Sequence, residues 1–392
     1  MLSRRAVLGA GIAALAAAAL TPHAQAQETV KVGLILPMTG PFASTGRQIE
    51  AAVKLYMAEH GDTVAGKKIE VILKDDTNVA DTTKRLAQEL VVNDGVKVIA
   101  GFGLTPLALA AAPIATQAKV PQIVMAAGTS IITERSPFIV RTSFTVAQKA
   151  SVMGEWAAKH KIGKVYTVVA DYAPGHDAEK IFKEHFTKSG GQVVGEARVP
   201  VASPDFAPFL QRAADAKPDA IFVFVPSGQG AAFTKQFVER GLDKSGIKLI
   251  ATGDLPDDDI LEGFGDTALG LISAGHYSAA HPSEKNKAYV AAFEKANPNM
   301  RPNFMSVGGY DGMHVIYEAL KKTSGNADGA ALLEAMTGLA FESPRGPITI
   351  DPATRDIIQN IYLRKVEKVG GKLYNVEFDV IEQVKDPGKP QK

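Results

Sequence analysis

Short apolar runs alternate with amphipathic segments along most of this chain, and this alternation constrains the fold more than any other feature. In the first part, the runs with the composition of buried strands are Val30–Pro37, Lys68–Lys74, Val96–Ala100 and Pro121–Met125. The segments between them, at about 43–60, 79–92 and 106–119, carry apolar residues at helical spacing. Strands that alternate with helices form βαβ crossovers, which build a parallel sheet covered by helices.

The same alternation returns in the second part of the chain. The strands expected there are Lys164–Ala170, Gln192–Val199, Ala220–Val225 and Lys248–Ala251, with helices at about 176–189, 205–216, 229–240 and 257–264. Beyond Leu271–His276, helices at about 283–296, 304–322 and 328–337 precede the strands Ile357–Val366 and Leu373–Val380. A chain of 392 residues is long enough for two domains. We therefore expect two α/β halves, followed by elements that need a sheet to pack on.

The first 26 residues have the pattern of an export signal. Arg4 and Arg5 precede the apolar run Ala6–Leu20, and Ala24-Gln25-Ala26 places small residues at the spacing that signal peptidase recognises. The run has about 15 residues, fewer than the roughly 20 that a membrane-spanning helix needs. Ser3–Leu8 approximates a twin-arginine pattern, so that route stays open beside ordinary secretion. We expect cleavage after Ala26 and a periplasmic mature protein.

Composition and missing motifs exclude several function classes. The formal net charge is +1, which lacks the basic field that nucleic-acid binding needs. The absence of cysteine excludes disulfides, thiolate metal sites, a cysteine nucleophile and a lipid-anchored cysteine. The sequence contains no GxSxG, HExxH, P-loop or GxGxxG motif. We therefore expect neither an enzyme nor a cofactor or metal, and we assign the triplet 257–259 to the first turn of a helix rather than to a cation site.

Turns rich in glycine and hydroxyl side chains follow several expected strands, where ligands of open α/β sheets bind. Gly101–Pro106 ends one strand and begins a helix, with Thr105 as a candidate N-cap, and free backbone N–H groups there can hold an anion. Met125–Thr129 and Thr39–Phe42 form two further turns of small residues. Together they indicate a site for a small anion.

The second half offers matching turns at Asp171–Gly175, Pro226–Gly230 and Thr252–Asp254. A cleft between the two halves would enclose a small molecule from both sides. The carboxylate of Asp254 suits a ligand ammonium group, although it also suits a helix cap. Tyr172 suits a residue that closes over a ligand, although it also suits the surface.

Five stretches, taken in order and spacing, carry a resemblance to a known family. They are VGLILPMTGPFASTG from Val32, VILKDDTNVADTTKRLAQELV from Val71, VIAGFGLTPLALAAAPIATQAKVPQIVMAAGTS from Val98, PFIVRTSF from Pro137 and FESPRGPITID from Phe341. Almost the whole mature chain resembles the periplasmic solute-binding proteins of ABC importers, in the branched-chain amino-acid (Leu/Ile/Val-binding) group.

This resemblance implies the type I periplasmic-binding-protein fold, in which two lobes, each a parallel-sheet αβα sandwich, are joined by three hinge crossings. It places the crossings near Arg141–Phe144, Ile272–His276 and Ile348–Asp351. The signal peptide would span 1–26, the first lobe 27–142 plus 276–349, and the second lobe 143–275 plus 350–392.

The resemblance also implies which residues bind the ligand. Thr105 matches the family's hydroxyl position for the carboxylate, and the turn of Ala126, Ala127, Gly128 and Thr129 matches its backbone contacts. Asp254 falls where the family meets an ammonium group. The remaining candidates around the expected cleft are Thr45, Tyr172, Ser227, Met305 and Tyr310.

Departures from the family pattern leave two classes of ligand to choose between. Tyr172 directly follows Asp171, and Pro226-Ser227 replaces a family tyrosine. The stretch ADYAPGHDAE from Ala170 looks like a subgroup that binds aromatic carboxylates and aromatic keto acids. We expect a monomeric protein that captures an amino acid or, with slight preference, an aromatic acid, and delivers it to an inner-membrane permease and its ATPase. A ligand-sensing receptor or regulator of the same fold and an exported enzyme are the alternatives.

Overall fold

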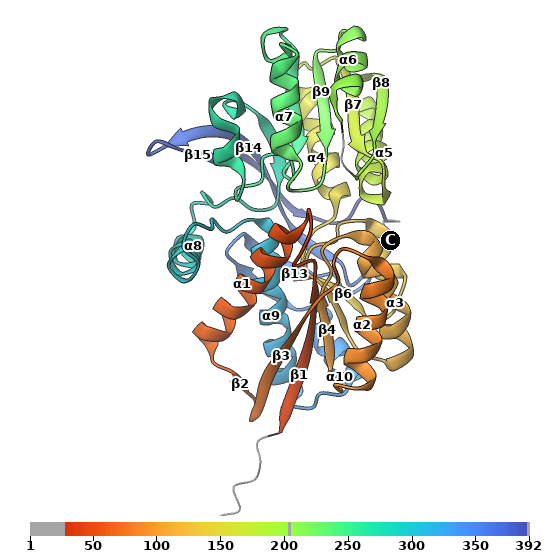
Figure 1. Cartoon of the computed structure of the whole chain (residues 1–392), viewed down its shortest axis with the longest axis vertical. Coiled ribbons are helices and arrows are strands. Elements are labelled where there is room, and N and C mark those ends of the chain that lie inside the picture. The colour runs from red at the N-terminus through yellow and green to blue at the C-terminus, as the bar shows by residue number, and fades with distance from the viewer. Residues whose placement is uncertain (1–27, 203–204, 390–392) are drawn as a thin grey trace, which may run out of the picture.

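Two lobes lie one above the other in the computed structural model, which describes residues 28–202 and 205–389 (Figure 1). Each lobe contains one sheet of mainly parallel strands between helices, so the predicted fold class is confirmed. The expected signal peptide lies outside the described residues. Within the described ranges, none of the helices combines the length and the apolar character that crossing a membrane requires.

The first sheet has the strand order β2-β3-β1-β4-β5-β6. Its strands are β1 (Thr29–Leu36), β2 (Thr63–Val64), β3 (Lys67–Asp75), β4 (Val98–Gly101), β5 (Gln122–Val124) and β6 (Ile139–Arg141). The helices between them are α1 (Ala43–His60), α2 (Ala80–Val92), α3 (Thr105–Ala118) and the 3-10 turn η1 (Ser130–Glu134). Only β2 runs antiparallel to its neighbour. Alternate residues of β1 are buried on opposite faces, as Leu34 and Ile35 are, because helices cover both sides.

The second sheet has the order β12-β13-β14-β11-β10-β9-β7-β8, with β15 paired to β14. Its parallel strands are β7 (Lys164–Ala170), β8 (Gln192–Val199), β9 (Ala220–Phe224), β10 (Lys248–Thr252) and β11 (Ile272–Gly275). Its helical elements are α4 (Val146–Lys159), α5 (Ala173–Lys188), α6 (Ala207–Asp215), α7 (Gly230–Glu239), η2 (Leu242–Lys244) and η3 (Leu261–Ala268). The helix expected at 257–264 is wrong: the structure has 3-10 turns that start at Leu261, and the triplet 257–259 precedes them in a turn.

The last part of the chain returns to both lobes. Helices α8 (Glu284–Ala296), α9 (Phe304–Lys322) and α10 (Gly329–Met336) follow β11, and α9 packs along α1. A Cβ at Gly308 would lie 2.2 Å from the carbonyl oxygen of Met125. The missing side chain therefore lets α9 lie directly against the turn that follows β5.

The antiparallel strands β12 (Ala340–Ser343), β13 (Gly346–Ile350), β14 (Ile357–Val369) and β15 (Lys372–Val384) extend the second sheet. Our expected boundary between 349 and 350 falls inside β13. The structure places β12 and β13 in the second sheet because β13 pairs with β14 across a short turn. Residues 340–349 therefore pair with the second sheet, while Phe341 and Arg345 contact His314 and Asp311 on α9 of the first lobe.

Buried arginines hold the segments that cross between the lobes. Arg345 donates to the carbonyl oxygens of Thr142 and Ser143, at 2.5 and 2.8 Å. Arg141 pairs with Asp356 at 2.6 Å, and both side chains are almost fully buried. A crossing strand leaves its carbonyl groups without sheet partners, so these guanidinium groups satisfy acceptors that would otherwise be buried unpaired.

Candidate functional site

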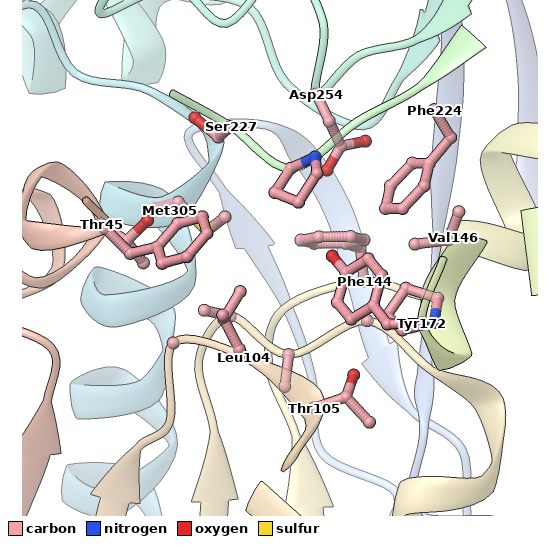
Figure 2. Close-up of a pocket in the computed structure, with 17 residues that line it drawn as sticks. Thr45, Leu104, Thr105, Phe144, Val146, Tyr172, Phe224, Ser227, Asp254 and Met305 are labelled. Carbon is pink, nitrogen blue, oxygen red and sulfur yellow. The ribbon is translucent and has the colours of Figure 1, made fainter. Parts of the chain in front are cut away.

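A cavity lies between the two lobes (Figure 2). The first-lobe residues that line it are Phe42, Thr45, Gly103, Leu104, Thr105, Ala126, Ala127, Gly128 and Met305. The crossing segment adds Phe144 and Val146, and the second lobe adds Tyr172, Pro174, Phe224, Pro226, Ser227 and Asp254. Apart from Phe144, Val146 and Met305, these residues follow the carboxyl ends of β1, β4, β5, β7, β9 and β10, so the ligand-binding edges of the two sheets face each other.

The lobes are closed on each other around this cavity. Ser44 on α1 donates to Asp259 of the second lobe at 2.6 Å. Asn303, just before α9, donates to Asp257 at 3.0 Å. On the other side of the cleft the N–H of Ser130 donates to Asp177 on α5 at 3.0 Å. Hydrogen bonds therefore join the lobes on both sides of the pocket.

The first-lobe end of the cavity suits an anion. Helix α3 begins at Thr105, so our N-cap assignment is wrong by one residue: Leu104 is the cap and makes no side-chain cap bond. Within the part of the chain that the structure describes, the backbone N–H groups of Thr105 and Gly128 have no acceptor. The hydroxyls of Thr105 and Thr129 are 2.9 Å apart. Unpaired N–H groups and a hydroxyl at the positive end of a helix dipole attract a carboxylate.

Gly128 also lets an aromatic ring enter the site. A Cβ at this position would lie 2.7 Å from the ring of Phe144. Phe144 therefore packs directly on the turn that offers the free N–H group. Thr129 lies behind this turn and reaches the pocket only through its hydrogen bond to Thr105.

Aromatic side chains form much of the remaining wall. They are Phe42, Phe144, Tyr172 and Phe224, and the rings of Tyr172 and Phe224 lie nearly parallel with centroids 6.1 Å apart. Burial raises the pKa of the Tyr172 phenol, which therefore stays protonated at neutral pH. Only Tyr172 was a predicted site residue: we assigned Phe144 to the hinge and Phe42 to a turn, and we treated Phe224 as strand interior.

An ion pair marks the second-lobe end. Lys149 on α4 donates from Nζ to Oδ2 of Asp254 at 2.7 Å, and the side chains are 1% and 4% exposed. Figure 2 shows Asp254 and Thr105 at opposite ends of the pocket. Burial lowers the pKa of Lys149 to about 8, and the Asp254 carboxylate opposes the shift, so the amine is charged at pH 7. Sequence reasoning missed Lys149, because nothing in its local pattern distinguishes it from a surface lysine.

The remaining predicted residues divide between the pocket and other places. Thr45, Ala126, Ala127, Ser227 and Met305 line the cavity. The Ser227 hydroxyl donates to Asp257, whose pKa is raised to about 7, first by burial and then by Asp259. Tyr310 is not brought to the pocket: its hydroxyl donates to Glu59 at 2.6 Å, and its ring packs edge-on against Tyr56. No cluster of three potential metal ligands occurs among the described residues.

Comparison with known proteins gives consistent matches. Residues 29–372 match a family model described as periplasmic binding protein. The chain is 45% identical over 381 residues to the Leu/Ile/Val-binding protein homolog 6 of Brucella abortus, covering 96% of this chain and 98% of that protein.

Two solved structures are also similar. A solute-binding protein of an ABC transporter from Rhodopseudomonas palustris BisB5, in complex with 3,4-dihydroxybenzoic acid, is 68% identical with a TM-score of 0.91, covering 92% of this chain and 99% of that one. Another from R. palustris, in complex with 4-hydroxybenzoate, is 40% identical with a TM-score of 0.89, at the same coverage of both chains.

Proposed function

Because the chain belongs to the periplasmic binding protein family, we propose that it is the substrate-binding component of an ABC transporter whose ligand is an aromatic carboxylate of the hydroxybenzoate type. The resemblance drawn from the sequence motifs is thus confirmed at the level of the family. The observation that carries the ligand proposal is the pocket itself, with aromatic walls and an anion-binding end. The two similar R. palustris proteins hold ligands of this class.

The contacts would divide between the lobes. The carboxylate would bind between the start of α3, where Thr105 offers its backbone N–H and hydroxyl, and the turn after β5, where Ala126 and Gly128 offer N–H groups and Ala127 lines the wall with its own N–H bonded to Phe102. The ring would stack among Phe42, Phe144, Tyr172 and Phe224, since aromatic pairs gain energy beyond buried area alone. Thr45, Ser227 and Met305 would complete the wall.

Transport would follow from differential affinity. Ligand contacts from both lobes stabilise the closed state, so binding shifts the population towards it. The closed protein would then be recognised by an inner-membrane permease, and the permease's own ATPase would supply the energy. Residues 1–26 would direct export to the periplasm by either signal route, and the mature protein would act as a monomer. The proteins that this chain matches are binding proteins.

An amino acid is the second candidate ligand. It is favoured by Asp254, which lies in the pocket lining, and by the Leu/Ile/Val-binding name of the Brucella relative.

Ligand-dependent melting of residues 27–392 tests the proposal. We expect 3,4-dihydroxybenzoate, 4-hydroxybenzoate or benzoate to raise the melting temperature by about 5 °C at 100 times Kd, since that excess adds about 2.7 kcal/mol. Cyclohexanecarboxylate is the matched control, because it keeps the carboxylate and removes the aromatic ring. Leucine and phenylalanine test the second candidate. A shift with leucine and none with any aromatic acid would overturn the proposal.

A further inference from the structure

Lys149 is a buried cation directly behind the wall of the pocket. Its Nζ lies 3.5 Å from the centre of the Phe144 ring and 4.9 Å from that of Phe304. Phe144 lines the cavity, so an aromatic ring stands between the amine and a ligand. The contact of an ammonium group with ring faces is favourable in itself, and more so where water is excluded. The amine is therefore held by Phe144, which lines the pocket, and by Phe304.

Asp254 is both the partner of Lys149 and the only acid among the described residues that line the pocket. Two charges taken out of water are tolerated only in direct contact, as they are here at 2.7 Å. Asp257 adds attraction for the amine, and Arg364 adds repulsion. The pair thus forms a unit without net charge at the second-lobe end of the site.

We propose that Lys149 is a specificity-determining residue, which occupies Asp254 from within the protein and so makes the site reject ligands that carry an α-ammonium group. This inference rests on the proposed function, because it defines the ligand class of the same pocket. An incoming ammonium group would find the carboxylate already paired. It would also bring a second positive charge close to the amine of Lys149, in a cavity with little water to screen the repulsion.

The same arrangement favours a ligand that has only a carboxylate. Such a ligand leaves the ion pair undisturbed and brings its one charge to the opposite end of the cavity, near the start of α3 (Figure 2). The sequence position of Asp254 suggests an amino-acid site. In this protein its carboxylate would instead bind the buried amine of Lys149.

A matched ligand pair tests this. 4-Hydroxyphenylacetate and L-4-hydroxyphenylglycine differ only in the α-ammonium group. We expect calorimetry at pH 7 to show that wild-type protein binds the first at least about 100-fold more tightly. Equal affinities within about threefold would overturn the inference while leaving an aromatic-acid transporter intact. If no aromatic acid binds in the earlier melting experiment, the proposed function fails instead.

The variant Lys149→Met tests whether this residue causes the discrimination against the α-ammonium group. The variant keeps most of the side-chain length without the charge and frees Asp254, so the affinity ratio should fall at least about tenfold, mainly through tighter binding of the amino acid. Adding Asp254→Asn should restore the preference, because the ammonium then has no partner. Lys159→Met, on the exposed end of the same helix, is the control and should leave the ratio unchanged.

Lys149→Gln is the second variant, for use where Lys149→Met fails to fold, because its uncharged amide can still donate to Asp254. An unchanged ratio in a folded Lys149 variant, judged by circular dichroism, would refute the role of the lysine.

Discussion

Thr105 shows how much of the site depends on single polar groups. Its backbone N–H is free, its hydroxyl pairs with that of Thr129, and the pocket end where it lies contains no charged side chain among its described lining. An anion bound there would depend on neutral donors. Hydrogen bonds to a charged group are each worth about 1.5–3 kcal/mol, so a few are sufficient for tight binding.

Thr105→Val should therefore weaken binding of an aromatic carboxylate by about tenfold or more. The change removes the hydroxyl and keeps the β-branched shape, so helix α3 should be retained. Thr116→Val on the same helix is the control, since the Thr116 hydroxyl bonds Ala112 and Ser136 away from the pocket. Titration calorimetry measures both. Equal affinity of the two variants would remove Thr105 from the carboxylate site.

At the scale of elements, the sequence predicted most of the parallel strands and the turns after them, because apolar runs and glycine turns are local signals, but it missed the short strands β2 and β6. Predicted turns such as Gly101–Pro106 and Met125–Thr129 do line the cavity. Lys149 and Phe144 could not be foreseen as a site, since their roles depend on the approach of a distant strand end at Asp254. Strands β12 and β13 were not predicted as strands, although each pairs with the next strand across a short turn.

The turn before η3 is another segment whose structure the local sequence did not predict. Its acids resemble a helix start in sequence, yet Asp257 accepts from Ser227 and from Asn303 of the other lobe. Burial holds the pKa of Asp257 at about 7, against 3.8 for an exposed aspartate. Between these values the folded protein keeps a proton that the unfolded chain has released. The free energy of unfolding due to this group therefore falls as pH rises towards 7.

Asp257→Asn should flatten this dependence. From about pH 5 to about pH 8 the wild type should lose about 1–3 °C more in melting temperature than the variant, because the amide does not titrate. Asp243→Asn, at an exposed position of the same lobe, is the control. Parallel melting curves for wild type and Asp257→Asn across this range would contradict a buried, protonated Asp257.

At the scale of the whole molecule, the C-terminal segment adds a connection that the three expected crossings do not include. After β15 the chain turns back to the boundary between the lobes, where its last described residues contact the first lobe. Asp386 accepts from the Ser130 hydroxyl at 2.9 Å, and Lys389 pairs with Asp356 at 2.8 Å and donates to Thr133. Ser130 and Thr133 belong to η1 of the first lobe, so the end of the chain ties that lobe to the second sheet.

Lys389→Ala should loosen this tie and lower the free energy of unfolding by about 1–3 kcal/mol. The loss should stay below that of a broken isolated ion pair, because Arg141 still neutralises Asp356 at 2.6 Å. Lys385→Ala is the matched control: Lys385 is half-exposed and lies 3.7 Å from Asp351, so its removal should change stability by less than about 0.5 kcal/mol. Urea unfolding compares the two. Since the segment reaches both lobes, Lys389→Ala should also raise the Kd for ligand, and an unchanged Kd together with unchanged stability would show that the C-terminal end does not hold the lobes together.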